Sequence, residues 1–251
     1  FNYTVGSSDN TSQLDYSSTS ALSGTITDLA GNTATLTLPD TTTSDLYTTD
    51  IVIDNTAPEI SSITTTSTSG TYGIGSSLTI NVIFSERVIK TGTPELTLSS
   101  GATVTTSTYD NTNTTEDTLV FTYVVAEGDT TSGSTLNATS LTGTITDQAL
   151  NSADVSNISA TWDNDIIIDA VKPTVTSVST TTSTGYYKNG AADIPISITF
   201  SEDVVVTGTP TIDLTMDGTN ASATYDSGSN SSTLTFNYTV GSSDNTSQLD
   251  Y

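Results

Sequence analysis

The stretch LTINVIF, residues 78–84, carries apolar side chains at every second position. The stretch IPISITF, residues 194–200, has the same pattern, and so do LVFTYVV at 119–125 and LTFNYTV at 234–240. A period of two residues is typical of a strand that buries one face. Threonine on the other face suits a pleated, half-buried surface. These stretches predict an all-β chain.

Two periods run through the chain. Residues 1–16 read FNYTVGSSDNTSQLDY and recur unchanged at 236–251, a shift of 235 positions. A shorter period of 115 or 116 positions relates Phe84-Ser85-Glu86 to Phe200-Ser201-Glu202. A fixed period is the signature of a repeat protein. The chain is therefore interpreted as a window on a series of tandem domains.

The repeated landmarks divide the chain into three parts. We predict the C-terminal part of one domain over residues 1–54, a complete domain over 55–169, and the N-terminal part of the next domain over 170–251. Residues 17–54 of the following copy would complete this last part. A unit of about 115 residues is close to the usual size of a domain that buries its own core.

Turn residues between the apolar runs divide the complete domain into about seven strands. No stretch has helical periodicity longer than two turns, so helix is not expected. Seven short antiparallel strands in a domain of this size are typical of an immunoglobulin-like sandwich. The predicted fold class is therefore all-β, with tandem immunoglobulin-like antiparallel β-sandwiches arranged end to end. The strands are expected near residues 59–66, 77–84, 87–90 with an edge piece at 94–98, 102–109, 118–125, 141–146 and 160–168.

The chain is acidic and rich in hydroxyl groups. Its formal net charge is −24, with only four Lys and Arg residues, and Ser and Thr supply 94 of the 251 residues. Such a surface repels phosphate groups, which disfavours nucleic acid and anionic membranes as partners. No apolar run approaches the roughly 18 residues of a membrane-spanning helix. We therefore expect no membrane insertion within this window, and divalent cations are the favoured partners.

The composition argues against an enzyme. The chain has no His to act as a base near neutral pH and no Cys to act as a nucleophile. Its three lysines, Lys90, Lys172 and Lys188, fall in predicted turns or linkers. A pair of carboxyl groups for glycoside hydrolysis is compatible with the composition, but one of them would need a raised pKa in an apolar cleft. We predict no enzymatic activity.

Several short motifs resemble those of a known family. They are VIDNTAP at 52–58, IFSE at 83–86, TGTP at 91–94, LDY at 14–16 and ITDLAGN at 26–32. With these motifs the chain looks like the bacterial immunoglobulin-like or cadherin-like tandem repeats of giant secreted adhesins and cell-surface fibre proteins, and the resemblance covers its whole length. The resemblance implies an extracellular or cell-surface location and Ca²⁺ at the joints between neighbouring domains.

Two positions of the central domain depart from this pattern. Leu150 stands where the other copy has Gly31, and Asn137 stands where it has Asp15. The first departure affects a turn. The second removes one carboxylate from the possible ligands of a joint.

Acidic residues gather at one predicted end of the complete domain. In a sandwich of this kind, the loops after the second, fourth and sixth strands lie at the end where the chain enters. Glu86, Asp110 and Asp147 follow those strands, and Asp54 lies in the entering linker. Their carboxylates would repel one another unless a cation binds between them. We expect oxygens of Asp54, Glu86 and Asp147 to converge to within about 5 Å of one point.

Calcium is the cation that this pattern favours, because Ca²⁺ takes six to eight oxygen ligands. No contiguous EF-hand loop is present. The candidate ligands lie in the linker, in loops of the complete domain and of the domain before it, and at equivalent positions of the second joint. The alternative is that these residues are solvated loop acids. The candidate ligands are Asp54, Glu86, Asp147, Asp9, Asp15, Asp169, Glu202, Asp129 and Asp28, with Asp250 equivalent to Asp15.

The sequence favours a structural function. The predicted module forms the shaft of an extracellular filament or adhesin, with neighbouring copies of the repeat as its end-to-end partners and calcium stiffening the joints. One alternative is a glycan-, ice- or protein-binding β-sandwich, which would use its threonine-rich strand faces. Another is a subunit of a sheath or surface layer, which would need lateral contacts between chains.

Overall fold

The computed structural model describes residues 2–108, 116–158, 162, 165–217 and 220–251. The chain divides into two compact units, Phe1–Ala170 and Val171–Tyr251. The regular secondary structure of both is almost entirely β-strand, and the all-β class is confirmed. None of the helices in the described part of the chain has the length and hydropathy that a membrane crossing requires.

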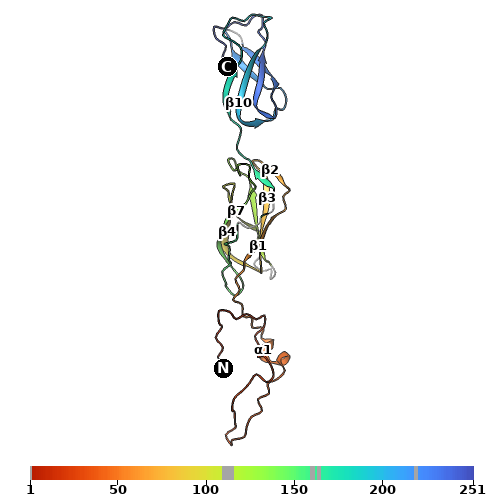
Figure 1. The fold of residues 1–251 in the computed structure, drawn as a ribbon, viewed down its shortest axis with the longest axis vertical. Helices are drawn as coiled ribbons and strands as arrows, with labels where there is room; N and C mark the ends of the chain where they lie inside the picture. The colour runs from red at the N-terminus through yellow and green to blue at the C-terminus, as the bar shows by residue number, and fades with distance from the viewer. Residues whose placement is uncertain (1, 109–115, 159–161, 163–164, 218–219) are drawn as a thin grey trace. The chain divides into compact units, whose positions relative to one another are not determined.

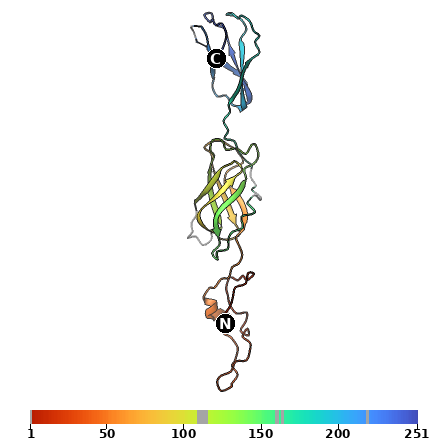
Figure 2. The same ribbon diagram turned by 90° about the vertical axis from the view of Figure 1, so that its left-hand side faces the viewer.

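The first unit contains one curled antiparallel sheet and a small parallel pair. The sheet has the strand order β1-β3-β6-β5-β4-β7, and β2 pairs with β8. In Figure 1, β1 and β3 lie on one side of this unit and β4 and β7 on the other, and Figure 2 shows strands of the sheet side by side. The strands are β1 (Ile60–Thr65), β2 (Gly70–Tyr72), β3 (Ser77–Phe84), β4 (Ile89–Leu98), β5 (Thr103–Thr108), β6 (Thr118–Val124), β7 (Ala138–Thr146) and β8 (Ile166–Ile168).

The core of the first unit lies where β3 and β6 bury one face. Ile80 pairs with Phe121 across these strands, and neither side chain is exposed. Every second residue of β3 is buried, as the period of LTINVIF predicts. Side chains of β4, β7 and β8 belong to the same core cluster, so they cover the apolar face of β3 and β6.

Two strand boundaries differ from those expected. A single strand, β4, replaces the two pieces expected at 87–90 and 94–98. Gly92 adopts a φ of +74°, so the strand continues through the Thr-Gly-Thr-Pro segment with a local irregularity. The pairing of β4 with β7 shifts register at this point. β7 begins at Ala138, ahead of the expected 141, because Thr97 of β4 pairs with Ser140. Asp110, and parts of the strands expected at 102–109 and 160–168, lie outside the described residues.

The parallel pair of β2 with β8 contradicts the expectation of purely antiparallel strands. The Gly70 N–H donates to the Asp165 carbonyl at 3.1 Å. The Asp169 N–H donates to the Tyr72 carbonyl at 3.0 Å. Ile166 and Ile168 of β8 are buried, and buried backbone groups need hydrogen-bond partners. The short strand β2 supplies those partners along one edge of β8.

Residues 2–54 have little regular structure. They contain the 3-10 turn η1 (Thr41–Thr43) and the short helix α1 (Asp45–Thr48), and none of these described residues belongs to a named strand. Isolated bridges join Thr11 to Ile53 and Thr27 to Thr33. The strand pairings expected for the end of a sandwich are therefore almost absent from this copy.

The second unit repeats part of the first. Its sheet has the order β11-β12-β13-β10-β9, which matches β4-β5-β6-β3-β1. The faces predicted at 194–200 and 234–240 lie on β10 and β13, which pair with each other and supply much of the core. The strands are β9 (Val175–Thr180), β10 (Ile194–Val204), β11 (Thr211–Thr215), β12 (Asn220–Ser227) and β13 (Ser231–Tyr238).

Substitution Phe121→Ala should lower the free energy of unfolding of the first unit by about 3 to 5 kcal/mol, because it leaves a cavity in a closed core. Val124→Ala, on the same strand but 57% exposed, should change it by less than about 1 kcal/mol. Urea unfolding of the two variants measures the difference. Equal losses would show that the face assigned to the core is wrong.

Candidate metal centre

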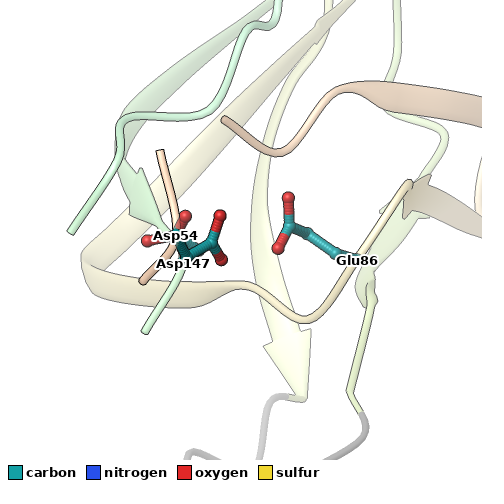
Figure 3. Close-up of side chains that lie close together, drawn as sticks. All are labelled: Asp54, Glu86 and Asp147. Atoms are coloured by element: carbon teal, nitrogen blue, oxygen red, sulfur yellow. The ribbon is translucent and has the colours of Figure 1, made fainter. Parts of the chain in front are cut away.

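Three carboxylates meet at one end of the first unit. Asp54 precedes β1, Glu86 follows β3 and Asp147 follows β7. One oxygen of each lies within 4.8 Å of the others. Figure 3 shows Asp54 and Asp147 close together, with the Glu86 carboxylate directed toward them. The convergence expected from the loop positions is therefore present in the structure.

The Asp147 carboxylate is held in place by its own loop. Its Oδ1 accepts a hydrogen bond from the Asn151 backbone N–H at 2.8 Å, and its Oδ2 accepts one from the Asn151 side-chain amide at 2.7 Å. The same amide donates to the Asp54 carbonyl at 3.0 Å. Asp147 is only 2% exposed. Asn151 thus fixes the buried carboxylate and ties the entering linker to this loop.

The turn inside this loop forms although Leu150 replaces the glycine of the other copy. Leu150 adopts a φ of +71°, and Gly31 at the equivalent place adopts +88°. This left-handed conformation is easy for glycine and costs a leucine roughly 1 to 2 kcal/mol. Because the Leu150 side chain is exposed, it does not clash with the loop. The loop therefore positions Asp147 without the glycine of the other copy.

The surroundings of Glu86 disfavour its charged form. Burial, and then the nearby Asp54 and Asp147, raises the pKa of Glu86 above its ordinary value. A divalent cation would reverse this effect by pairing with all three carboxylates. Two oxygens bound to one Ca²⁺ lie at most roughly 5 Å apart, given bonds of about 2.3 to 2.6 Å. The observed spacing of the carboxylate oxygens fits this limit.

Asp28 repeats the Asp147 loop in the first part of the chain. Its oxygens accept hydrogen bonds from the Asn32 side chain and the Asn32 backbone, both at 2.8 Å. These bonds, with the Asn32 side chain contributing most, lower the pKa of Asp28. No second group of three acidic side chains comes as close together anywhere in the described residues. Asp28 is thus a preformed loop carboxylate with no acidic cluster around it.

Asp9 and Asp129 have another partner, a tyrosine six residues earlier. The Tyr123 hydroxyl donates to Asp129 at 2.8 Å, and the Ala126 N–H donates to the same oxygen at 2.9 Å. Asp9 accepts in the same way from the Tyr3 hydroxyl and the Gly6 N–H. Neither aspartate belongs to the three-acid group. Their position supports a structural role in a turn.

A third copy of this contact occurs at Asp244. Its Oδ2 accepts from the Tyr238 hydroxyl at 2.6 Å and from the Gly241 N–H at 2.7 Å. The hydrogen bond from Tyr238 is the main cause of the lowered pKa of Asp244. This tyrosine–aspartate contact was not among the predictions from the sequence. The signal that could have revealed it is the constant spacing of six residues in all three copies.

The remaining candidates also lie outside the three-acid group. Asp15 Oδ1 accepts from the Tyr16 N–H at 2.8 Å, whereas its Oδ2 and one oxygen of Glu202 are buried without a hydrogen-bond partner. Asp169 is exposed and pairs through its backbone with Tyr72. Asp250 accepts from the Tyr251 N–H at 2.9 Å. Their assignment as ligands stays a prediction.

Comparison with known proteins identifies no relative. No family model matches the chain, and neither a curated protein nor a solved structure matches it significantly. The candidate metal centre therefore rests on its own geometry.

The tyrosine–aspartate contacts predict a loss of stability at alkaline pH. Burial, and then the aspartate partner, raises the pKa of Tyr123 and of Tyr238 to about 12, whereas an unfolded tyrosine ionises near pH 10. The stabilisation is therefore complete below about pH 10 and is lost as the pH rises toward 12. Absorbance of tyrosinate should show two groups that ionise only near pH 12.

The matched variants for this prediction are Tyr123→Phe and Tyr186→Phe. The first should remove one late-ionising group and reduce the loss of stability between about pH 10 and 12. The second changes a fully exposed tyrosine and should leave the pH dependence of unfolding unaltered. Ionisation of every tyrosine near pH 10 in the folded chain would contradict the prediction.

Proposed function

We propose that the chain is a structural repeat module that forms the shaft of an extracellular filament or adhesin. Ca²⁺ would bind at the joint where the linker containing Asp54 enters the next domain. The observation that carries this proposal is the convergence of Asp54, Glu86 and Asp147. Because one comes from the linker and two from loops of the domain, an ion bound by all three would tie the linker to the domain. The joint would then lose the freedom of a hinge.

The sheet order supports an immunoglobulin-like form for each domain. Such sandwiches have one sheet of order ABED and another of order CFG. The order β1-β3-β6-β5 fits the first sheet, and β4-β7 fits the start of the second. The same order in β9-β10-β13-β12, together with the identical residues 1–16 and 236–251, supports tandem copies.

The proposed mechanism is mechanical. In a tandem array each domain buries its own core and touches only its neighbours, so copies add length. The partners of the module are then neighbouring copies of the same repeat. The net charge of −24 makes bare chains repel one another, and Ca²⁺ lowers that repulsion where it matters, at the joint. Adhesion to a target would be the task of other domains.

Calcium should bind the full chain and stabilise its first unit. We take a dissociation constant of roughly 10⁻⁴ M, as in extracellular calcium modules. A free Ca²⁺ concentration about one hundred times that constant would then stabilise the fold by about 2.7 kcal/mol. Glu86→Gln should weaken calcium binding at least about tenfold, because it removes one ligand charge. Isothermal titration calorimetry and thermal unfolding with and without Ca²⁺ measure both effects.

The matched control is Glu95→Gln, which removes one charge from an exposed position on β4 of the same unit. It should leave calcium affinity unchanged. Without calcium, Glu86→Gln should be as stable as the parent chain or more stable at neutral pH, because a raised folded pKa makes ionised Glu86 unfavourable there. Loss of affinity in both variants alike would point to general charge and against this site.

Chelation should loosen the joint before it unfolds a domain. Small-angle scattering of the full chain should show greater bending when a chelator replaces calcium, while circular dichroism of the strands stays constant. The physical reason is that the core of the first unit contains none of the three acids. Unchanged scattering on chelation, with calcium binding intact, would rule out a stiffening role for the ion.

A further inference from the structure

The second unit leaves part of its apolar face open. A groove of about 460 Å³ is lined by Phe200, Val204, Val205 and Leu234, among others. A second hollow of about 170 Å³ lies beside Val178, Ile196 and Leu249. Val175 and Val205 are 54% and 74% exposed. An apolar surface of this kind on a folded sheet marks a place where another segment packs.

The first unit shows what covers the same positions. Phe84 and Val88, the equivalents of Phe200 and Val204, are at most 2% exposed. They belong to a core cluster that also contains Leu141 and Ile145 of β7 and Ile166 and Ile168 of β8. The cover therefore comes from the last two strands of the domain, and the second unit has no counterpart of them among its described residues.

Residues 17–54 carry the sequence of that cover. Gly24-Thr-Ile-Thr-Asp28 matches Gly143-Thr-Ile-Thr-Asp147 of β7, and Ile51-Val-Ile-Asp54 matches Ile166-Ile-Ile-Asp169 at β8. Yet Ile26 is 43% exposed where Ile145 is 5% exposed, and Ile51 is 38% exposed where Ile166 is 1% exposed. Ile53, the equivalent of Ile168, is buried, but Ile26, Ile51 and the open face lack the burial that their equivalents have in the first unit.

The free edge of β11 has the right register to receive this segment. In the first unit, β4 pairs with β5 on one edge and with β7 on the other. Its equivalent β11 pairs with β12, and no described strand lies along its other edge. The Thr215 N–H donates to the Asp250 carbonyl at 2.9 Å, as the Ser99 N–H donates to the Asn137 carbonyl at 2.8 Å just before β7.

The segment 17–54 and the second unit are attached to the domain between them at two different places. The linker enters that unit beside Glu86 and Asp147, whereas the chain leaves it beside Asp129, whose carbonyl accepts from the Ala170 N–H at 2.9 Å. Asp129 follows the end of β6, and the start of β6 lies beside Phe84, before Glu86. Residues 17–54 and the open face are therefore attached to opposite ends of one sandwich.

We propose that residues 17–54 of a second copy of this chain close the open face of Val171–Tyr251, with residues near 19–23 pairing antiparallel to β11 as residues 138–142 of β7 pair with β4. The inference names the contact surface in the proposed array of repeats. It can fail separately from the calcium joint, because Asp54, Glu86 and Asp147 all lie in one copy. A contact that adds copies in one direction is open-ended and grows into chains.

Light scattering of the full chain during size-exclusion chromatography tests the contact. The 251-residue chain should associate increasingly with concentration. Ile26→Asp should reduce this association at least about tenfold, because it places a charge at a position whose equivalent is buried in the core of the first unit. Thr25→Asp adds the same charge at the position equivalent to the exposed Thr144 and should leave association unchanged. Both variants should bind calcium as the parent chain does.

A second form of the chain keeps the test decisive if association is weak. A full chain in which a second copy of residues 17–54 follows Tyr251 should show amide hydrogen exchange in β11 at least about tenfold slower than in the parent chain. The same extension carrying Ile26→Asp should lose most of that protection. A monomeric parent chain whose β11 is not protected by the extension, or association insensitive to Ile26→Asp, would overturn the proposal.

Discussion

The pairing of β3 with β6 is the constraint on which the rest of the first unit depends. Both strands bury the same face, with Ile80 opposite Phe121, and a shift of one residue would turn every apolar side chain of a strand to solvent. The register therefore determines where each strand ends. The loop after β3 and the loop after β7 come to the same end as the linker, and this places Glu86 and Asp147 beside Asp54.

The long alternating strands and the three-acid group were predictable because each depends on a strong local pattern. The alternation in LTINVIF predicts which of its side chains are buried, and strand direction alone assigns Glu86 and Asp147 to one end of the domain. The pair β2–β8 was not predictable, because a strand of three residues such as Gly70–Tyr72 has no period of its own. Its formation depends on the buried β8, which lies far away in sequence.

Loop aspartates are the second place where sequence reasoning falls short. Asp129 and Asp147 are both aspartates in polar loops, but one accepts a hydrogen bond from Tyr123 and the other from Asn151. The identical residues 1–16 and 236–251 show which part of this is local. Both copies make the tyrosine–aspartate contact, yet Tyr3 is 57% exposed and Tyr238 only 3%. The hydrogen bond comes from the segment itself, whereas burial comes from the neighbouring strands.

Anomalous diffraction from crystals of the full chain grown with calcium tests whether the three acids form a cation site at the joint. We expect a calcium peak bonded to oxygens of Asp54, Glu86 and Asp147 at about 2.3 to 2.6 Å, and no such peak in crystals of the Glu86→Gln variant. A calcium-soaked structure in which the three carboxylates turn apart, or hold only water between them, would contradict it.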